Sequence, residues 1–173
     1  MSGIGDIWRQ AAAKWTEVVA QVTDDDWDKP TTCDEWTVRE LVDHAMHWQA
    51  MGGGIVGAGT TPGDDWATIA PKLSAALDDP GNLEGNAEAM GGMPKQQAAG
   101  LLVGDLVIHA WDLARSIGAD DTLPVAPVEA TLMGLQRMPQ EMMRSSGMFG
   151  EPVEVADDAG PQDRLLAFTG RTP

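Results

Sequence analysis

The residues best suited to chemistry are His44, Asp105 and His109, in a chain that contains only three histidines. Asp105 and His109 are four residues apart, and side chains at this spacing on a helix lie within reach of one shared ion. His44 belongs to an earlier segment, and the three side chains meet if the two segments pack together as helices. Two imidazoles and a carboxylate suit zinc first, with nickel, manganese or ferrous iron as alternatives. Three protein ligands leave a coordination position for water or substrate, which is typical of reactive zinc sites.

The surroundings of Asp105 and His109 favour a cation beside them. At about 100° per residue, His109 falls at the centre of an apolar stripe and Asp105 on its flank. The stripe consists of Leu102, Leu106, Leu113 and Ile117. A carboxylate buried beside leucines is costly without a compensating cation, which is either a metal ion or a protonated histidine. Spacing alone therefore leaves open a hydrogen-bonded His–Asp pair that binds no metal.

Three further residues have roles that the sequence leaves open. His47 follows His44 by three residues and lies further round the helix, which favours a surface or supporting position over ligation. Asp112 either orients a ligand or caps a neighbour, or forms an ion pair with Arg115. Cys33 is expected to be a small buried side chain, because a nucleophilic role needs a neighbouring base that the sequence does not show.

Helical periodicity and capping signals predict the elements that position these side chains. The first helix is predicted over Ile4 to Gln21, where apolar residues recur at helical spacing. The second begins at Thr37, which has the capping-box spacing with Glu40, and it ends or loosens at Gly52–Gly54. The third is predicted to open at Thr61–Pro62 and to run to Leu77.

Prolines and glycines divide the rest of the helical pattern. Pro71 is expected to break or kink the third helix. The strongest helix is predicted from Pro94 to Ile117, stopped by Gly118, and it carries both Asp105 and His109. A fifth helix is predicted from Pro127 to Arg144, with a disturbance at Pro139.

The predicted fold class is all-α, as an antiparallel four-helix bundle with a short irregular C-terminal tail. Residues 78–93 are predicted to form a long loop, and no alternating pattern is long enough for a sheet. Residues 146–173 are the predicted tail, packed on the bundle, with an extended piece at Pro152–Val155 and a helical turn at Arg164–Phe168. The chain length favours a single domain over residues 1–173.

Composition limits the partners and the location. The formal net charge of −16 repels phosphate backbones and anionic membranes, so nucleic acid and membrane surfaces are not expected partners. The single cysteine, Cys33, excludes an intramolecular disulfide and a cysteine-based zinc cluster. No signal-like segment and no run of about 18 apolar residues is present, so we expect a cytoplasmic protein. Pairing into a homodimer is compatible with a bundle but is not specified.

Three groups of motifs resemble the DinB/YfiT-like superfamily, and more specifically its mycothiol-dependent, maleylpyruvate-isomerase-type branch. Residues 36–44 (WTVRELVDH) resemble the motif of the second helix, and residues 104–115 (GDLVIHAWDLAR) resemble the second metal motif. Segments 149–153 and 161–166 resemble an uncharacterised subgroup of metal-binding proteins. The resemblance implies a four-helix bundle in which His44, Asp105 and His109 hold a divalent metal.

The resemblance also suggests an activity and shows two departures. It implies a metal-dependent transferase or isomerase, in which a small thiol such as mycothiol is held as a thiolate for attack on an electrophile. The isomerase has glutamate where this chain has the shorter Asp105, and it carries an additional C-terminal domain where this chain has the tail. The alternatives are a non-catalytic metal-binding or ligand-binding protein of the stress response, and a bundle without metal.

Overall fold

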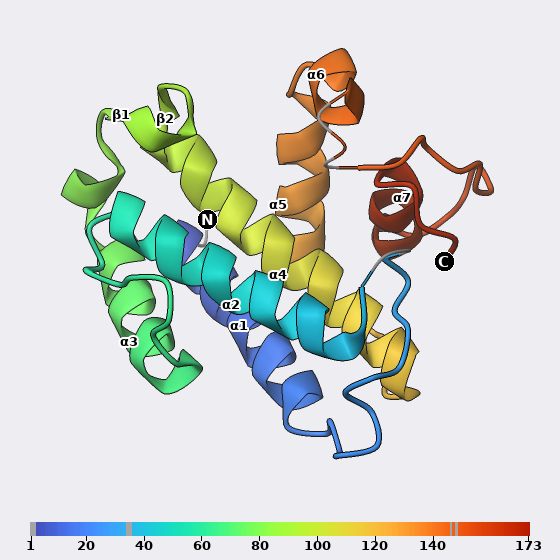
Figure 1. Cartoon of the computed structure of the whole chain (residues 1–173). Helices are drawn as coiled ribbons and strands as arrows, with labels where there is room; N and C mark the ends of the chain where they lie inside the picture. Colours follow the sequence, from blue (N-terminus) through green and yellow to red (C-terminus); the bar gives the residue numbers. More distant parts are fainter. Residues whose placement is uncertain (1–2, 34–35, 146, 148) are drawn as a thin grey trace.

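The computed structural model describes residues 3–33, 36–145, 147 and 149–173, and these residues are mostly helical (Figure 1). Within these residues the α-helices are α1 (Ile4–Val19), α2 (Val38–Ile55), α3 (Trp66–Leu77), α4 (Lys95–Ile117), α5 (Val125–Gln136), α6 (Gln140–Ser145) and α7 (Pro161–Phe168). The predicted helical class is therefore confirmed for the described residues. None of these helices has the length and apolar character that crossing a membrane requires.

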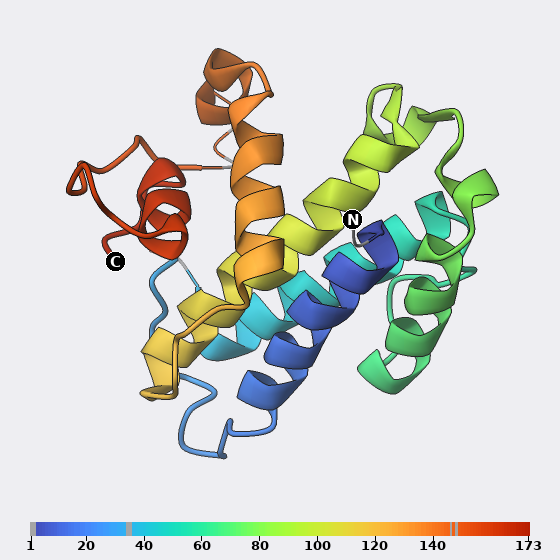
Figure 2. The same cartoon turned by 180° about the vertical axis from the view of Figure 1, so that it is seen from behind.

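The central element is α4, which packs against α1, α2 and α5. Seen from behind, α1 runs alongside α4, and α5 stands at a steep angle to both (Figure 2). Because it is enclosed on several sides, α4 buries residues around most of its circumference rather than along one stripe. Its predicted bounds are correct to within one residue, and Gly118 caps it with a φ of 74°, a conformation that glycine adopts without strain.

The start of α2 is as predicted, and the helix ends at Ile55, directly after the glycines at 52–54. Thr37 and Glu40 form both hydrogen bonds of the capping box. The helix continues through Gly52 because that glycine allows close packing against α4. A Cβ built at Gly52 would lie 2.2 Å from the Leu102 side chain, which is buried.

The third helix begins later than predicted and is not broken. Its N-cap is Asp65, whose carboxylate accepts a hydrogen bond from the Thr68 amide, and the helix starts at Trp66 rather than at Thr61–Pro62. It runs continuously through Pro71. Proline in the second turn removes a single backbone hydrogen bond, and the packing of α3 against α1 and α2 keeps the helix intact.

The predicted loop at 78–93 contains short regular elements instead. Two 3₁₀ turns (Pro80–Leu83 and Glu88–Met90) alternate with the strands β1 (Asn86–Ala87) and β2 (Met93–Pro94), which pair antiparallel. Gly91 and Gly92, with φ values of 69° and 78°, reverse the chain between the strands. A pairing of two residues leaves no alternating pattern in the sequence, so the prediction of no sheet missed it.

The predicted helix over Pro127–Arg144 is two helices. Pro139 lies in the gap between α5 and α6, where proline is tolerated because it precedes the first turn of a helix. In the predicted tail, Ser146 and Met148 lie outside the described residues. The predicted turn at Arg164–Phe168 is the second half of α7, which packs against α5.

Substitution of Gly52 by alanine tests the close packing of α2 on α4. We expect Gly52→Ala to lower the free energy of unfolding by about 1–3 kcal/mol, because the added methyl group overpacks a buried contact. Gly100→Ala, inside α4 where a Cβ meets nothing within 4 Å, should instead stabilise by about 0.5–1 kcal/mol. Urea unfolding measures both, and equal effects of the two substitutions would contradict this packing.

Candidate metal centre

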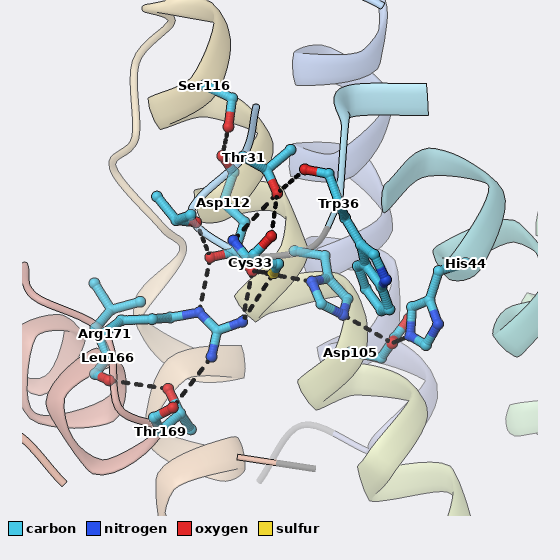
Figure 3. A network of polar contacts seen from close by, with 12 residues as sticks. Thr31, Cys33, Trp36, His44, Asp105, Asp112, Ser116, Leu166, Thr169 and Arg171 are labelled. Carbon is cyan, nitrogen blue, oxygen red and sulfur yellow. Dashed lines mark hydrogen bonds and ion pairs between the residues drawn. The ribbon is translucent and has the colours of Figure 1, made fainter. Parts of the chain in front are cut away.

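The three predicted ligands lie together at the contact of α2 and α4 (Figure 3). Nε2 of His44 is 3.4 Å from Oδ1 of Asp105, and Nε2 of His109 is 3.5 Å from the same oxygen. The potential ligand atoms of all three residues lie within 4.8 Å of one another. The histidine rings meet edge to face, with centroids 5.1 Å apart. Both imidazoles therefore direct a nitrogen toward one carboxylate oxygen.

The other oxygen of Asp105 is held from behind by Gln49. The amide nitrogen of Gln49 donates to Asp105 Oδ2 (3.1 Å) and to the Leu102 carbonyl (2.9 Å), and its oxygen accepts from the indole of Trp8 (3.1 Å). Gln49 is completely buried. Because Oδ2 is already engaged, Oδ1 is the oxygen left for the histidines or for a cation between them.

His109 is held on its other side by Asp112. Nδ1 of His109 is 2.9 Å from Asp112 Oδ2, and Asp112 is completely buried. The predicted alternative of an Asp112–Arg115 ion pair is wrong, because Arg115 pairs with Asp121 at 3.2 Å. Asp112 instead contacts the ring of His109, which agrees with the alternative in which it orients a ligand.

Asp112 is also the centre of a wider polar network. Arg171 donates from Nε to Oδ1 and from Nη2 to Oδ2, both at 2.7 Å. Thr32 donates to Oδ1 at 2.5 Å, and the thiol of Cys33 lies 3.4 Å from Oδ2. Cys33, His109 and Asp112 also form a group with metal-ligand spacing. The guanidinium of Arg171 already supplies the cation there, so His44, Asp105 and His109 are the better candidate.

The buried charges shift two pKa values in opposite directions. Burial lowers the pKa of His109, but its hydrogen bonds with Asp112 and Cys33 and the charges of Asp105 and Asp112 outweigh burial and raise the pKa to about 10. Burial raises the pKa of Asp112, but the hydrogen bonds and charges of His109 and Arg171 hold it well below its usual range. Without a metal ion, His109 is therefore protonated at neutral pH.

Trp36 covers the histidine pair. Its ring centroid lies 4.5 Å from that of His44 and 5.9 Å from that of His109. The side chain of His44 is 36% exposed, against 12% for His109, so His44 is the solvent-facing member of the pair. His47 is exposed and lies outside the metal-ligand groups found among the described residues, in line with its predicted surface position.

A cavity of about 1170 Å³ opens beside the three residues. Its walls come from the loop before α2, from α2, α4 and α5, and from residues 149–173, the C-terminal segment; they include Trp36, Cys33 and Arg171. Cys33 was expected to be a buried filler, but it is half-buried and lines this cavity. Such a volume accommodates a small organic molecule beside a metal ion.

Sequence reasoning did not identify Gln49 or Arg171 as parts of the site. Gln49 carried a signal, because it continues the apolar spacing of Leu41 and Ala45 as a polar residue on the buried face of α2. The sequence around Arg171 gives no such signal, because its partner Asp112 is 59 residues away and no local spacing connects the two residues.

The comparisons with known proteins support the family resemblance over part of the chain. Residues 8–65 match the sequence profile of the mycothiol maleylpyruvate isomerase N-terminal domain. This segment includes His44 but not Asp105 or His109. Two curated relatives come from Mycobacterium tuberculosis, one from strain CDC 1551 and one from strain H37Rv, and both are described only as uncharacterised proteins. Each is 27% identical over 173 residues, which covers 95% of this chain and 95% of the relative.

No solved structure gives a significant match to the chain. The resemblance predicted from the sequence is nevertheless confirmed, because residues 8–65 match the mycothiol maleylpyruvate isomerase N-terminal domain family, which is part of the DinB-like superfamily.

Proposed function

We propose that the protein binds one divalent metal ion through His44, Asp105 and His109 and acts as a metal-dependent thiol transferase or isomerase on a small electrophile. The observation that carries the metal site is the distance from each histidine nitrogen to the same oxygen of Asp105. The two histidine nitrogens lie 3.4 and 3.5 Å from Asp105 Oδ1, and neither contact is a hydrogen bond. Two ligands of a tetrahedral zinc ion with bonds of about 2.0–2.1 Å are roughly 3.3–3.4 Å apart, so the spacing fits.

The residues around the donors support the same assignment. Gln49 leaves one oxygen of Asp105 free, and Asp112 engages Nδ1 of His109, so that Nε2 is the nitrogen on the metal side. Carboxylate–histidine pairs of this kind commonly support metal ligands. The donor set favours zinc first, with nickel, manganese and ferrous iron as alternatives.

The thiol chemistry is supported by the family match and by the cavity. When bound, a divalent cation lowers the pKa of a thiol, so that the thiolate predominates at neutral pH. Three protein donors would leave a bound metal ion able to take a further ligand, and all three residues line the cavity, together with Trp36 and Arg171. The thiol is mycothiol or a compound of similar size, and the electrophile occupies the remaining volume.

We also propose that the whole chain forms one DinB-like domain with a four-helix bundle. The support is the pattern of contacts between helices. Helix α1 packs against α3 and α4, and α2 packs against the same two helices. In this arrangement α5, α6 and α7 are additions to the bundle, and α5 and the C-terminal segment form one side of the cavity.

Metal content of matched variants tests the site. We expect wild-type protein, stripped with a chelator and reloaded with zinc, to hold about one ion per chain. His109→Ala and Asp105→Ala should weaken zinc binding by at least about 100-fold, because each removes a ligand rather than a supporting residue. His47→Ala is the control, since His47 is exposed and lies outside the site. Equal zinc affinity of His109→Ala and wild type, by chelator competition, would rule out the site.

The pH dependence of binding tests the competition between metal and proton. With a pKa of about 10, His109 must release a proton before Nε2 can bind a metal. Zinc affinity should therefore tighten roughly tenfold per pH unit between pH 7 and 8.5 from this group alone. A histidine with its usual pKa of about 6.5 would already be mostly deprotonated at pH 7, and the affinity would change less than about twofold over this range. Competition titrations with a chelator of known proton affinity distinguish the two cases.

Turnover tests the enzymatic half of the proposal. Mycothiol and a chromogenic aryl halide should react faster with zinc-loaded protein than without it, and the acceleration should be lost in Asp105→Ala and kept in His47→Ala. If protein loaded with zinc, nickel, manganese or ferrous iron fails to accelerate the reaction of mycothiol with several electrophiles, the enzymatic proposal is wrong. The alternative of a non-catalytic metal-binding protein then replaces the enzymatic proposal.

A further inference from the structure

Arg171 is the residue after α7 that reaches the metal centre through Asp112. Its guanidinium forms two parallel hydrogen bonds with Asp112, both at 2.7 Å, and a third with the Thr169 carbonyl at 3.3 Å (Figure 3). The side chain of Arg171 is 13% exposed and that of Asp112 is fully buried. Two-point pairing of arginine with a carboxylate fixes both the position and the plane of the carboxylate.

The carboxylate that Arg171 fixes is the one that holds His109. Asp112 Oδ2 contacts Nη2 of Arg171 and Nδ1 of His109 at once, so it connects the guanidinium to the imidazole. An imidazole bonded at Nδ1 cannot rotate freely, and its Nε2 stays directed at Asp105. The position of Nε2 therefore depends on a side chain from the C-terminal segment.

Arg171 also contacts the loop before α2. Nη2 lies 3.6 Å from the sulfur of Cys33, and Thr32 in the same loop donates to Asp112. The loop, α4 and the C-terminal segment thus meet at one carboxylate. Each of the three also lines the cavity.

We propose that Arg171 is a positioning residue of the metal centre. By holding Asp112, it fixes His109 in the orientation that metal binding requires, although it does not contact the metal. The C-terminal segment then contributes to the geometry of the metal centre as well as to the fold. The inference rests on the proposed metal site.

A purely structural role is the competing explanation. Buried ion pairs contribute little net stability but cost stability when one partner is removed, so Arg171→Gln will destabilise the protein under either explanation. The test therefore needs a measurement at the metal in protein that is still folded.

Cobalt(II) supplies this measurement, because its visible absorption reports the arrangement of its ligands. We expect Arg171→Gln to weaken cobalt binding about 10–100-fold and to change the absorption bands. Arg171→Lys should be intermediate, because lysine keeps the charge but cannot form two parallel hydrogen bonds. Arg164→Gln is the matched control, since Arg164 is exposed in the same segment and donates to the Asp157 carbonyl.

A double-mutant cycle shows whether Arg171 acts through Asp112. The loss of cobalt affinity in Asp112→Asn combined with Arg171→Gln should be close to that of Asp112→Asn alone.

Wild-type cobalt affinity and absorption spectrum in folded Arg171→Gln would overturn this inference and leave the proposed metal site unaffected. If Arg171→Gln does not fold, the cobalt affinity of Arg171→Lys is measured instead. Wild-type cobalt affinity in Arg171→Lys would then overturn the inference. Wild-type protein that binds no cobalt would overturn the metal site and this inference together.

Discussion

Two buried carboxylates, those of Asp105 and Asp112, require positive charge beside them, and the rest of the structure depends on how that requirement is met. Asp105 and Asp112 lie about one turn of α4 before and after His109, and the side chains of both are almost completely removed from solvent. Asp112 is neutralised by Arg171 and by its contact with His109. Asp105 has the amide of Gln49 on one oxygen and two histidines at 3.4 and 3.5 Å from the other. A divalent cation bound as proposed would place positive charge beside Oδ1 of Asp105.

The fold can be understood as the means of bringing these charges together. α4 supplies Asp105, His109 and Asp112 from a single rigid element, and α2 reaches it closely because Gly52 carries no side chain at the contact with Leu102. The loop before α2 and the C-terminal segment then close on Asp112 from two sides. The cavity is the space that these elements leave beside the histidines, and it gives a small molecule access to them.

Much of this could be predicted from the sequence, for physical reasons. The helices α1, α2 and α4 follow from periodicity and from caps that act over three or four residues, and His109 and Asp105 share a helix face by spacing alone. The start of α3 was missed because Thr61 and Asp65 are both good caps and only packing decides between them. The short hairpin was missed because two residues per strand carry no pattern. Arg171 could not be found because its pairing with Asp112 depends on tertiary structure, and Gln49 was overlooked although it interrupts an apolar stripe.

X-ray absorption at the zinc edge identifies the atoms bound to the metal and so shows whether His44, Asp105 and His109 hold it. For zinc-loaded protein we expect only nitrogen and oxygen neighbours, at about 2.0–2.2 Å, with the imidazole signature of two histidines. Addition of the thiol should introduce one sulfur at about 2.3 Å. A sulfur neighbour before any thiol is added would place the zinc at Cys33, and a spectrum with fewer than two imidazoles would also contradict a site built from His44, Asp105 and His109.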